Sequence, residues 1–182
     1  MPGFTHTPIA TISEEVENIT ITCSAPSKSF NIAGLQGSNI IIKNPELREK
    51  LTSQQGKKGF HSLNTISFEA TRLAYSKGEA WLDEFKELIY TNYQLVVDFI
   101  NKNLPKVKVT PLEGTYLMWL DFRAYGLTYQ ELEKRMQHAN LYLDEGYVFG
   151  KEGQGFERVN IATPTKVLQA ALDRLYEEFK GE

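Results

Sequence analysis

A second cysteine is missing from this chain of 182 residues, which contains only Cys23. No internal disulfide can form, so a disulfide-stabilised secreted domain is excluded and a reducing cytoplasm is the expected location. Cys23 lies in a β-strand pattern and is expected to be a small buried hydrophobic residue. Long apolar runs are missing too, since segments such as 39–42 are far shorter than the roughly 20 residues that span a bilayer. The segment 1–8 lacks the features of a signal peptide, and we expect no membrane partner.

A surplus of charge of one sign is also missing. The sequence has 20 basic and 23 acidic residues spread along its length, for a net charge of −3. This balance provides no basic patch for a nucleic-acid partner. His6, His61 and His138 are too scattered for a metal motif, and one cysteine provides no zinc signature. What is present is 41% hydrophobic and 24% charged residues, which is typical of a globular protein with a sizeable core.

Periodicity and capping residues predict two short strands followed by three helices in the first part of the chain. The expected strands are 19–23 and 39–43, and the expected helices are 45–55, 62–76 and 79–103. The second strand is apolar at 40–42 and is therefore expected to be buried on both faces. Asn44 and Pro45 are a typical N-cap and first helical residue. Apolar residues keep helical spacing from Glu79 to Asn103, which predicts one long amphipathic helix.

The remainder of the sequence predicts a compact mixed α/β unit. Its expected strands are 106–111, 115–122, 141–143 and 156–162, and its expected helices are 128–140 and 165–180. Thr128 and Glu131 have the spacing of a capping box. Asp144 and Glu145, beside a glycine, are interpreted as a turn. The order of these elements places a domain boundary within the long helix, near residues 76–100.

The segment 25–35, which reads APSKSFNIAGL, is the first candidate functional site. Lys28 stands in a serine-rich loop just after an expected strand, and open α/β sheets bind their ligands at the carboxyl ends of strands. A desolvated amine there is a nucleophile, and serine hydroxyls with loop amides can bind a phosphate. The alternative is a solvated surface lysine, which is the common role of lysine in a polar loop.

This segment resembles the Schiff-base lysine motif of the fold-type I pyridoxal-phosphate enzymes, aminotransferase class I/II. It is similar in particular to the motif of bacterial cystathionine β-lyases of the MalY and PatB type. Residues 113–122 (EGTYLMWLDF) resemble a strand pair in the small domain of that branch, and residues 156–162 (FERVNIA) resemble its substrate-carboxylate segment. Three motifs in the same order at compatible spacing make the resemblance specific.

The resemblance implies an α/β aminotransferase-like fold of which this chain is the carboxyl-terminal half. Residues 1–75 would be the remnant of the large cofactor-binding domain and its sheet. Residues 76–104 would be the long interdomain helix, and residues 105–182 the small α+β domain. The parent enzyme is expected to be a homodimer.

The resemblance also implies roles for individual residues. Lys28 would bind pyridoxal 5'-phosphate covalently and act as the general base at the substrate Cα. Ser27 and Ser24 would donate hydrogen bonds near the cofactor phosphate. Arg158 would pair with the α-carboxylate of a small amino-acid substrate through a bidentate fork. Without the resemblance, Arg158 beside an apolar strand would be interpreted as a structural ion-pair partner.

Two departures from the family pattern affect the predicted activity. Many aminotransferases have a phosphate-binding arginine eight positions after the lysine, where this chain has Gln36. This favours C–S β-elimination, as in cystathionine β-lyase or cysteine-S-conjugate lyase, over the alternative of transamination. The phosphate loop, the ring-stacking aromatic residue and the aspartate at the ring nitrogen have no counterpart here. We therefore expect the chain alone to bind the cofactor poorly, and a catalytically inert binding or interaction module is the alternative of another class.

Overall fold

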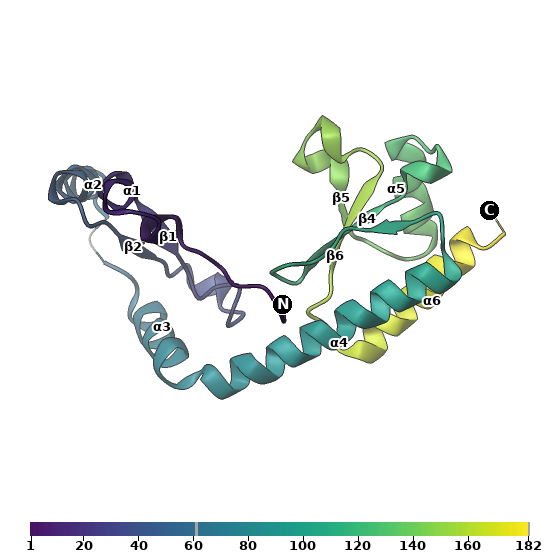
Figure 1. Ribbon diagram of the computed structural model, residues 1–182, viewed down its shortest axis with the longest axis horizontal. Coiled ribbons are helices and arrows are strands. Elements are labelled where there is room, and N and C mark those ends of the chain that lie inside the picture. Colours follow the sequence, from purple (N-terminus) through teal and green to yellow (C-terminus); the bar gives the residue numbers. More distant parts are fainter. Residues whose placement is uncertain (61, 182) are drawn as a thin grey trace. The chain divides into compact units, whose positions relative to one another are not determined.

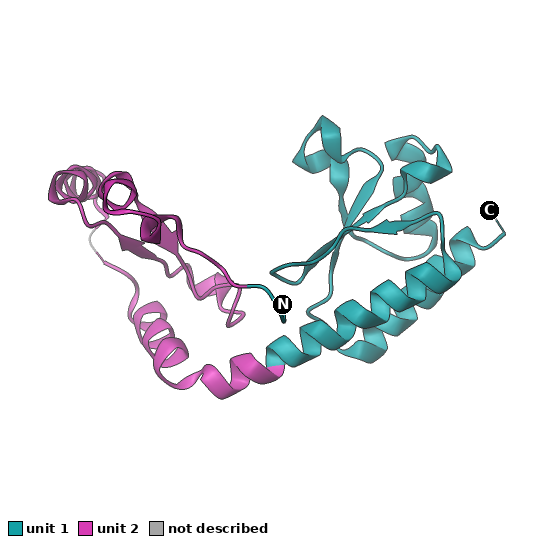
Figure 2. Ribbon diagram, viewed as in Figure 1, with its two compact units in different colours: residues 1–4, 85–182 teal, residues 5–84 magenta. Residues whose placement is uncertain are grey.

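The computed structural model describes residues 1–60 and 62–181, so His61 lies outside the described residues. The chain forms two compact units (Figure 2), one of residues Thr5–Glu84 and the other of Met1–Phe4 with Phe85–Glu182. The division falls inside helix α4, Glu79–Asn103. The three-part division at residues 75 and 104 concerns domain roles in a whole enzyme and stays a prediction. Among the described residues, none of the helices is both long enough and apolar enough to cross a membrane.

The unit of residues 5–84 contains a two-stranded sheet and several helices (Figure 1). In chain order its elements are η1 (Ile9–Thr11), α1 (Glu14–Ile19), β1 (Thr22–Ser24), η2 (Ala33–Leu35), β2 (Asn39–Ile41), α2 (Pro45–Lys57), α3 (Thr65–Lys77) and the start of α4. β1 and β2 pair antiparallel, with Cys23 opposite Ile40. The strand expected at 19–23 starts later because Ile19 ends α1, a helix that the sequence analysis did not predict. The Ser13 hydroxyl caps α1 by accepting a hydrogen bond from the Val16 amide.

The prediction of a strand buried on both faces at 40–42 was wrong. Ile40 is 42% exposed and Ile41 is 62% exposed, whereas Ile42 is buried. Cys23 is exposed as well, so the prediction of a buried cysteine was also wrong. The physical reason is the same for all three exposed residues: a sheet of two strands has too few neighbours to cover its own side chains.

Helices α2, α3 and α4 follow the local signals in the sequence. The Asn44 side chain accepts hydrogen bonds from the amides of Glu46 and Leu47, with Pro45 at the first helical position. α4 begins and ends at the predicted residues, Glu79 and Asn103.

The second unit contains a four-stranded antiparallel sheet in the order β3-β4-β6-β5. Its elements after α4 are β3 (Lys108–Val109), β4 (Leu117–Asp121), η3 (Arg123–Tyr125), α5 (Tyr129–His138), β5 (Asp144–Glu145), η4 (Gly146–Phe149), η5 (Lys151–Gly153), β6 (Phe156–Asn160) and α6 (Thr165–Phe179). Both hydrogen bonds of the capping box between Thr128 and Glu131 are formed at the start of α5. The interpretation of Asp144 and Glu145 as a turn was wrong, because they form strand β5 and pair with Arg158 and Glu157 of β6.

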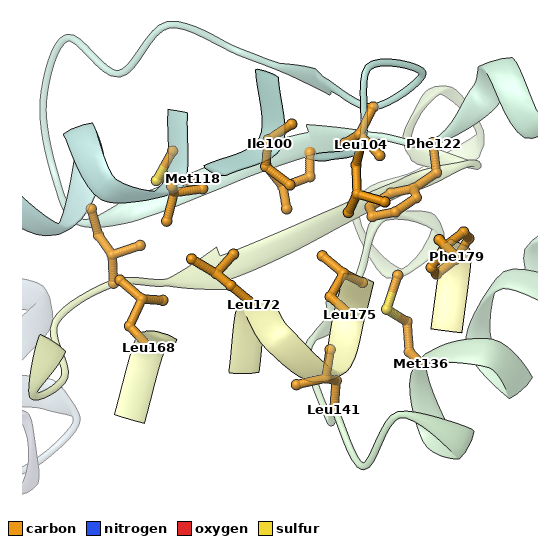
Figure 3. Packing of buried hydrophobic residues seen from close by; sticks show 14 of the residues in the cluster. Ile100, Leu104, Met118, Phe122, Met136, Leu141, Leu168, Leu172, Leu175 and Phe179 are labelled. Carbon is orange, nitrogen blue, oxygen red and sulfur yellow. The ribbon is translucent and has the colours of Figure 1, made fainter. Parts of the chain in front are cut away.

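The core of this unit lies on one face of the sheet, between the sheet and helices α4, α5 and α6 (Figure 3). On β4 the residues alternate: Met118 and Leu120 are buried, and Trp119 is half-buried on the other side. Residues directly opposite each other on antiparallel strands share a face. Glu157, opposite Leu120, therefore lies on the inner face, and Arg158, opposite Trp119, lies on the outer face.

A buried asparagine joins α4 to the connection between β6 and α6. The Asn92 side-chain amide donates hydrogen bonds to the carbonyls of Ile161 and Thr163, each 2.8 Å long. Its oxygen accepts a hydrogen bond of 2.8 Å from the Thr165 hydroxyl. α4 and α6 lie side by side in Figure 1, and this side chain helps to hold them in register.

Candidate functional site

Lys28 lies in a tight turn that immediately follows β1. The Phe30 amide donates to the Pro26 carbonyl at 2.9 Å and the Ile32 amide donates to the Ser27 carbonyl at 3.1 Å, so the chain around Lys28 is closed by two hydrogen bonds. Asn31 has a left-handed φ of 53°, which lets the turn reverse. Lys28 itself is exposed, and within residues 1–60 and 62–181 its amine has no ion pair or hydrogen bond.

Phe30 fixes this turn against the junction of α3 and α4. Its ring stacks on Trp81 with centroids 6.0 Å apart and meets Tyr75 edge-on at 6.1 Å. Gly78 makes room for the ring, because a Cβ there would lie 2.5 Å from Phe30 Cε1 and 2.5 Å from the Ala74 carbonyl oxygen. The turn is therefore held by side-chain packing on one side while the Lys28 side of the loop is open.

The two predicted serines belong to the same segment as Lys28. Ser24 is the last residue of β1 and is exposed, and Ser27 is half-buried within the turn. Gln36, which occupies the position of the expected arginine, is exposed and has a left-handed φ of 56°. The segment thus offers a primary amine and two hydroxyls, which can react with a carbonyl and donate hydrogen bonds to an anion.

Arg158 lies in the other unit, on the outer face of the small sheet. Its Nε and Nη2 donate to the same oxygen of Asp144, Oδ2, at 3.1 and 2.7 Å. The guanidinium carbon lies 4.3 Å from the centroid of the Phe149 ring. Arg158 is thus both an ion-pair partner, as its sequence neighbourhood suggested, and a guanidinium held in a fixed orientation.

Aromatic side chains surround this arginine. Trp119 meets Phe149 edge-on at 5.3 Å and Phe156 edge-on at 6.1 Å. Phe156 in turn lies under the guanidinium of Arg123, 4.5 Å from its carbon. The outer face therefore presents alternating aromatic rings and guanidinium groups, a surface suited to a ligand with a carboxylate and an apolar part.

The sequence analysis missed two acids beside Arg158. Asp144 was assigned to a turn, although the alternation of Leu141, Tyr142 and Leu143 could have been continued through it as a strand. Glu157 was not considered at all, and it is 2% exposed. No local signal marks it, because its burial depends on the helices that cover the inner face of the sheet.

Burial, together with the nearby charges of Glu145, Glu133 and Asp144, raises the pKa of Glu157 to about 8. Its Oε2 has no hydrogen-bond partner among the described residues. Within the described part of the chain, no group of three or more histidine, cysteine, aspartate or glutamate side chains is arranged to hold a metal ion. The raised pKa favours the protonated, neutral form of this carboxyl near neutral pH.

The structure places Ser24, Ser27 and Lys28 together in one unit and Arg158 in the other. Tyr116, in the segment 113–122 that resembles the small-domain strand pair, packs edge-on against Phe85 at 6.1 Å. The assignment of the four residues to a cofactor and a substrate stays a prediction.

Comparisons with known proteins identify relatives of the whole chain. The cystathionine β-lyase PatB of Bacillus subtilis is 42% identical over 174 residues, which cover 95% of this chain and 45% of PatB. Protein MalY of Escherichia coli is 32% identical over 79% of this chain and 37% of MalY. No family model matches.

A solved structure has the same fold. Cystalysin from Treponema denticola, whose crystal structure contains a pyridoxal 5'-phosphate cofactor, matches 99% of this chain with a TM-score of 0.95 and 43% identity. The match covers 46% of the cystalysin chain. This chain therefore spans a little under half the length of the relatives it matches, and the resemblance and the fold class predicted from its sequence are confirmed.

Proposed function

We propose that this chain is the carboxyl-terminal part of a fold-type I pyridoxal-phosphate enzyme related to the MalY and PatB type, and that the whole enzyme catalyses C–S β-elimination on a small amino acid. The observation that supports this most directly is an exposed lysine amine without a partner among the described residues, in a fixed turn of a chain 42% identical to a cystathionine β-lyase. Transamination is the alternative, and it shares the same lysine and arginine.

The residues of the Lys28 turn fit pyridoxal phosphate in two respects. The cofactor has an aldehyde, which a primary amine can bind covalently, and a phosphate, which hydroxyl donors can bind. Lys28 would provide the amine, and Ser24 and Ser27 the hydroxyls. When bound, the cofactor supplies an electron sink that stabilises negative charge at the substrate Cα.

The chain's own residues would divide the work between substrate binding and proton transfer. Arg158 holds the α-carboxylate, since its planar fork matches the two oxygens. Once the substrate's amino group has displaced Lys28 Nζ from the aldehyde carbon, this amine would be free to remove the proton from Cα as the general base. The electron pair released at Cα forms a double bond to Cβ as the Cβ–S bond breaks, and the thiolate leaves and takes a proton. Water then converts the released enamine to pyruvate and ammonia.

We further propose that the enzyme acts in the cytoplasm and forms a homodimer. The single cysteine supports a reducing compartment. The homodimer follows from the resemblance.

The decisive experiment is incubation of the whole enzyme with L-cystathionine. Pyruvate and free thiol formed without any keto acid support β-elimination, and strict dependence on a keto acid favours transamination. Lys28→Ala should abolish turnover, whereas Lys77→Ala, an exposed lysine at the end of α3, should not change it. Arg158→Lys should raise the KM by roughly tenfold or more because lysine cannot form the fork.

The absorption spectrum tests the chain by itself. We expect weak binding of pyridoxal phosphate, seen as an aldimine-region band that appears only at high cofactor concentration. The band should vanish in Lys28→Ala and persist in Lys77→Ala. Absence of any Lys28-dependent band in both the chain and the whole enzyme would favour the inert interaction module.

A further inference from the structure

The outer face of the small sheet holds two arginines, each stacked on a phenylalanine and paired with an aspartate. Arg158 lies on Phe149 and binds Asp144. Arg123 lies on Phe156 and binds Asp121.

The two pairs differ in how the guanidinium is used. Arg123 Nε donates to Asp121 Oδ1 at 2.9 Å and Nη2 donates to Oδ2 at 2.8 Å, so both carboxylate oxygens are engaged in a bidentate pair. The side chain of Arg123 is 62% exposed, whereas that of Arg158 is 24% exposed. The pair of Arg123 and Asp121 therefore has the same chemical groups as the pair of Arg158 and Asp144, but its arginine is more exposed to solvent.

Among the residues that the structure describes, the hydrogen bonds of Arg158 leave one edge of its guanidinium without a partner. A guanidinium has five N–H donors, and Asp144 takes one from Nε and one from Nη2. The remaining donors are both hydrogens of Nη1 and the second hydrogen of Nη2. One hydrogen of Nη1 and the second hydrogen of Nη2 form the terminal edge of the group, which can bind a second carboxylate through two parallel hydrogen bonds.

The position of Asp144 is itself fixed by the sheet. It lies directly opposite Arg158 in the antiparallel pair of β5 and β6. Phe149, in the 3-10 turn that follows β5, forms the floor under the guanidinium. The side-chain orientation of Arg158 is therefore restrained from the side by Asp144 and from below by Phe149, all within one unit.

We propose that Asp144 is a positioning residue for substrate binding: it holds Nε and Nη2 of Arg158 so that the terminal Nη1–Nη2 edge is presented to the α-carboxylate. The inference rests on the proposed function, which assigns the substrate carboxylate to Arg158. Asp144 does not touch the substrate and acts through the arginine alone.

Removal of Asp144 should weaken carboxylate binding without changing the chemistry. A long side chain that is no longer held must lose its rotational freedom when the ligand binds, which lowers the affinity by about tenfold. Asp144→Ala should show this full loss. Asp144→Asn keeps an acceptor oxygen, so it should recover part of the affinity.

The test uses the ¹⁵N-labelled 182-residue chain and L-alanine as the probe. NMR spectra of the arginine side chains report the exchange of Arg158 Nε–H with water and the shifts of its Nη groups during titration. We expect slow Nε–H exchange in the wild type, faster exchange in Asp144→Ala, and L-alanine binding about tenfold weaker in that variant. Asp121→Ala, the matched control, should alter the Arg123 signals and leave L-alanine binding unchanged.

The outcomes of this experiment separate the role of Asp144 from the role of Arg158. If Arg158→Lys abolishes L-alanine binding while Asp144→Ala leaves it unchanged or tightens it, the inference is overturned and the role of Arg158 stands. If L-alanine shifts no Arg158 signal in the wild type, or if Arg158→Lys binds it normally, the role of Arg158 in the proposed function fails and the inference fails with it. In the whole enzyme, Asp144→Ala should raise KM and leave kcat nearly unchanged.

Discussion

At the scale of one residue, the burial of Glu157 makes the stability of the fold depend on pH. Three acids act on it: Glu145 and Asp144 from β5, and Glu133 from α5. The Tyr147 hydroxyl of η4 donates to Glu133 at 3.3 Å, so it does not satisfy Glu157. Protonation is therefore the way in which this buried carboxyl avoids an uncompensated charge.

The first prediction concerns stability against pH. The pKa of Glu157 rises from an ordinary 4.5 to about 8 on folding, so the folded state binds the proton more tightly than the unfolded state. The contribution to stability is fully present below about pH 4.5 and is lost as the pH rises through 8. Its size is on the order of 5 kcal/mol. Urea unfolding from pH 5 to 9, followed at Trp119 in a Trp81→Phe background, measures it.

A neutral isostere separates this effect from the other acids. Glu157→Gln cannot ionise, so it should flatten the fall in stability between pH 5 and 8. Glu87→Gln, at an exposed position of α4, should keep the wild-type slope. An unchanged slope in Glu157→Gln would show that this carboxyl is not the group responsible.

At the scale of elements, one packed corner holds the lysine turn. Gly78→Ala would place a Cβ 2.5 Å from both the Phe30 ring and the Ala74 carbonyl oxygen, so either the ring or the helix end must move. We expect a loss of about 1–3 kcal/mol in the stability of this unit. Trp81, which stacks on Phe30, reports it by fluorescence during urea unfolding.

Gly34→Ala is the matched control for that prediction. It lies in the segment that contains Lys28, and a Cβ there would have no atom within 4 Å. It should change stability by no more than about 0.5 kcal/mol. Equal losses in the two variants would mean that the Phe30 contact does not hold the turn.

Asn92 connects elements that lie far apart in sequence. Its replacement by leucine would leave the buried Ile161 carbonyl and the partly buried Thr163 carbonyl without these donors, and the Thr165 hydroxyl without its acceptor. An unsatisfied buried polar group costs about 1–3 kcal/mol, so we expect a loss of roughly 2–4 kcal/mol. Asn101→Ala, on the exposed side of the same helix, should be nearly neutral, and thermal unfolding of both variants provides the comparison.

At the scale of the whole molecule, the two units differ in how well they bury their apolar side chains. The unit with the small sheet encloses a core of buried side chains from its sheet and three helices. The unit of residues 5–84 leaves Ile21, Ile40 and Ile41 exposed around a two-stranded sheet, at 46%, 42% and 62%. Unpaired strand edges with exposed apolar residues favour association between chains.

We therefore expect the isolated chain to self-associate through β1 and β2 as its concentration rises. Ile41→Lys places a charge on this sheet and should lower the average mass in light scattering. Val167→Lys changes an equally exposed apolar residue of α6, 56% exposed, and should have no such effect. A monomeric wild-type chain at all concentrations would contradict the prediction.

The longer helices, α2 to α6, were predicted well because their signals are local, whereas the six-residue α1 was missed. The Asn44 cap, the capping box of Thr128 and Glu131, and the continuous spacing from Glu79 to Asn103 lie within the elements that they define. The short strands were predicted less well. β5 has two residues, and whether such a segment is a strand or a turn depends on its partner β6.

By itself, the sequence determined the longer helices, the lysine segment and the resemblance to pyridoxal-phosphate enzymes, because the signals for each of these lie in neighbouring residues. Only the tertiary structure decided that Cys23 is exposed, that Glu157 is buried and that Asp144 binds Arg158. Burial and pairing depend on residues that are distant along the chain, and folding alone brings them into contact.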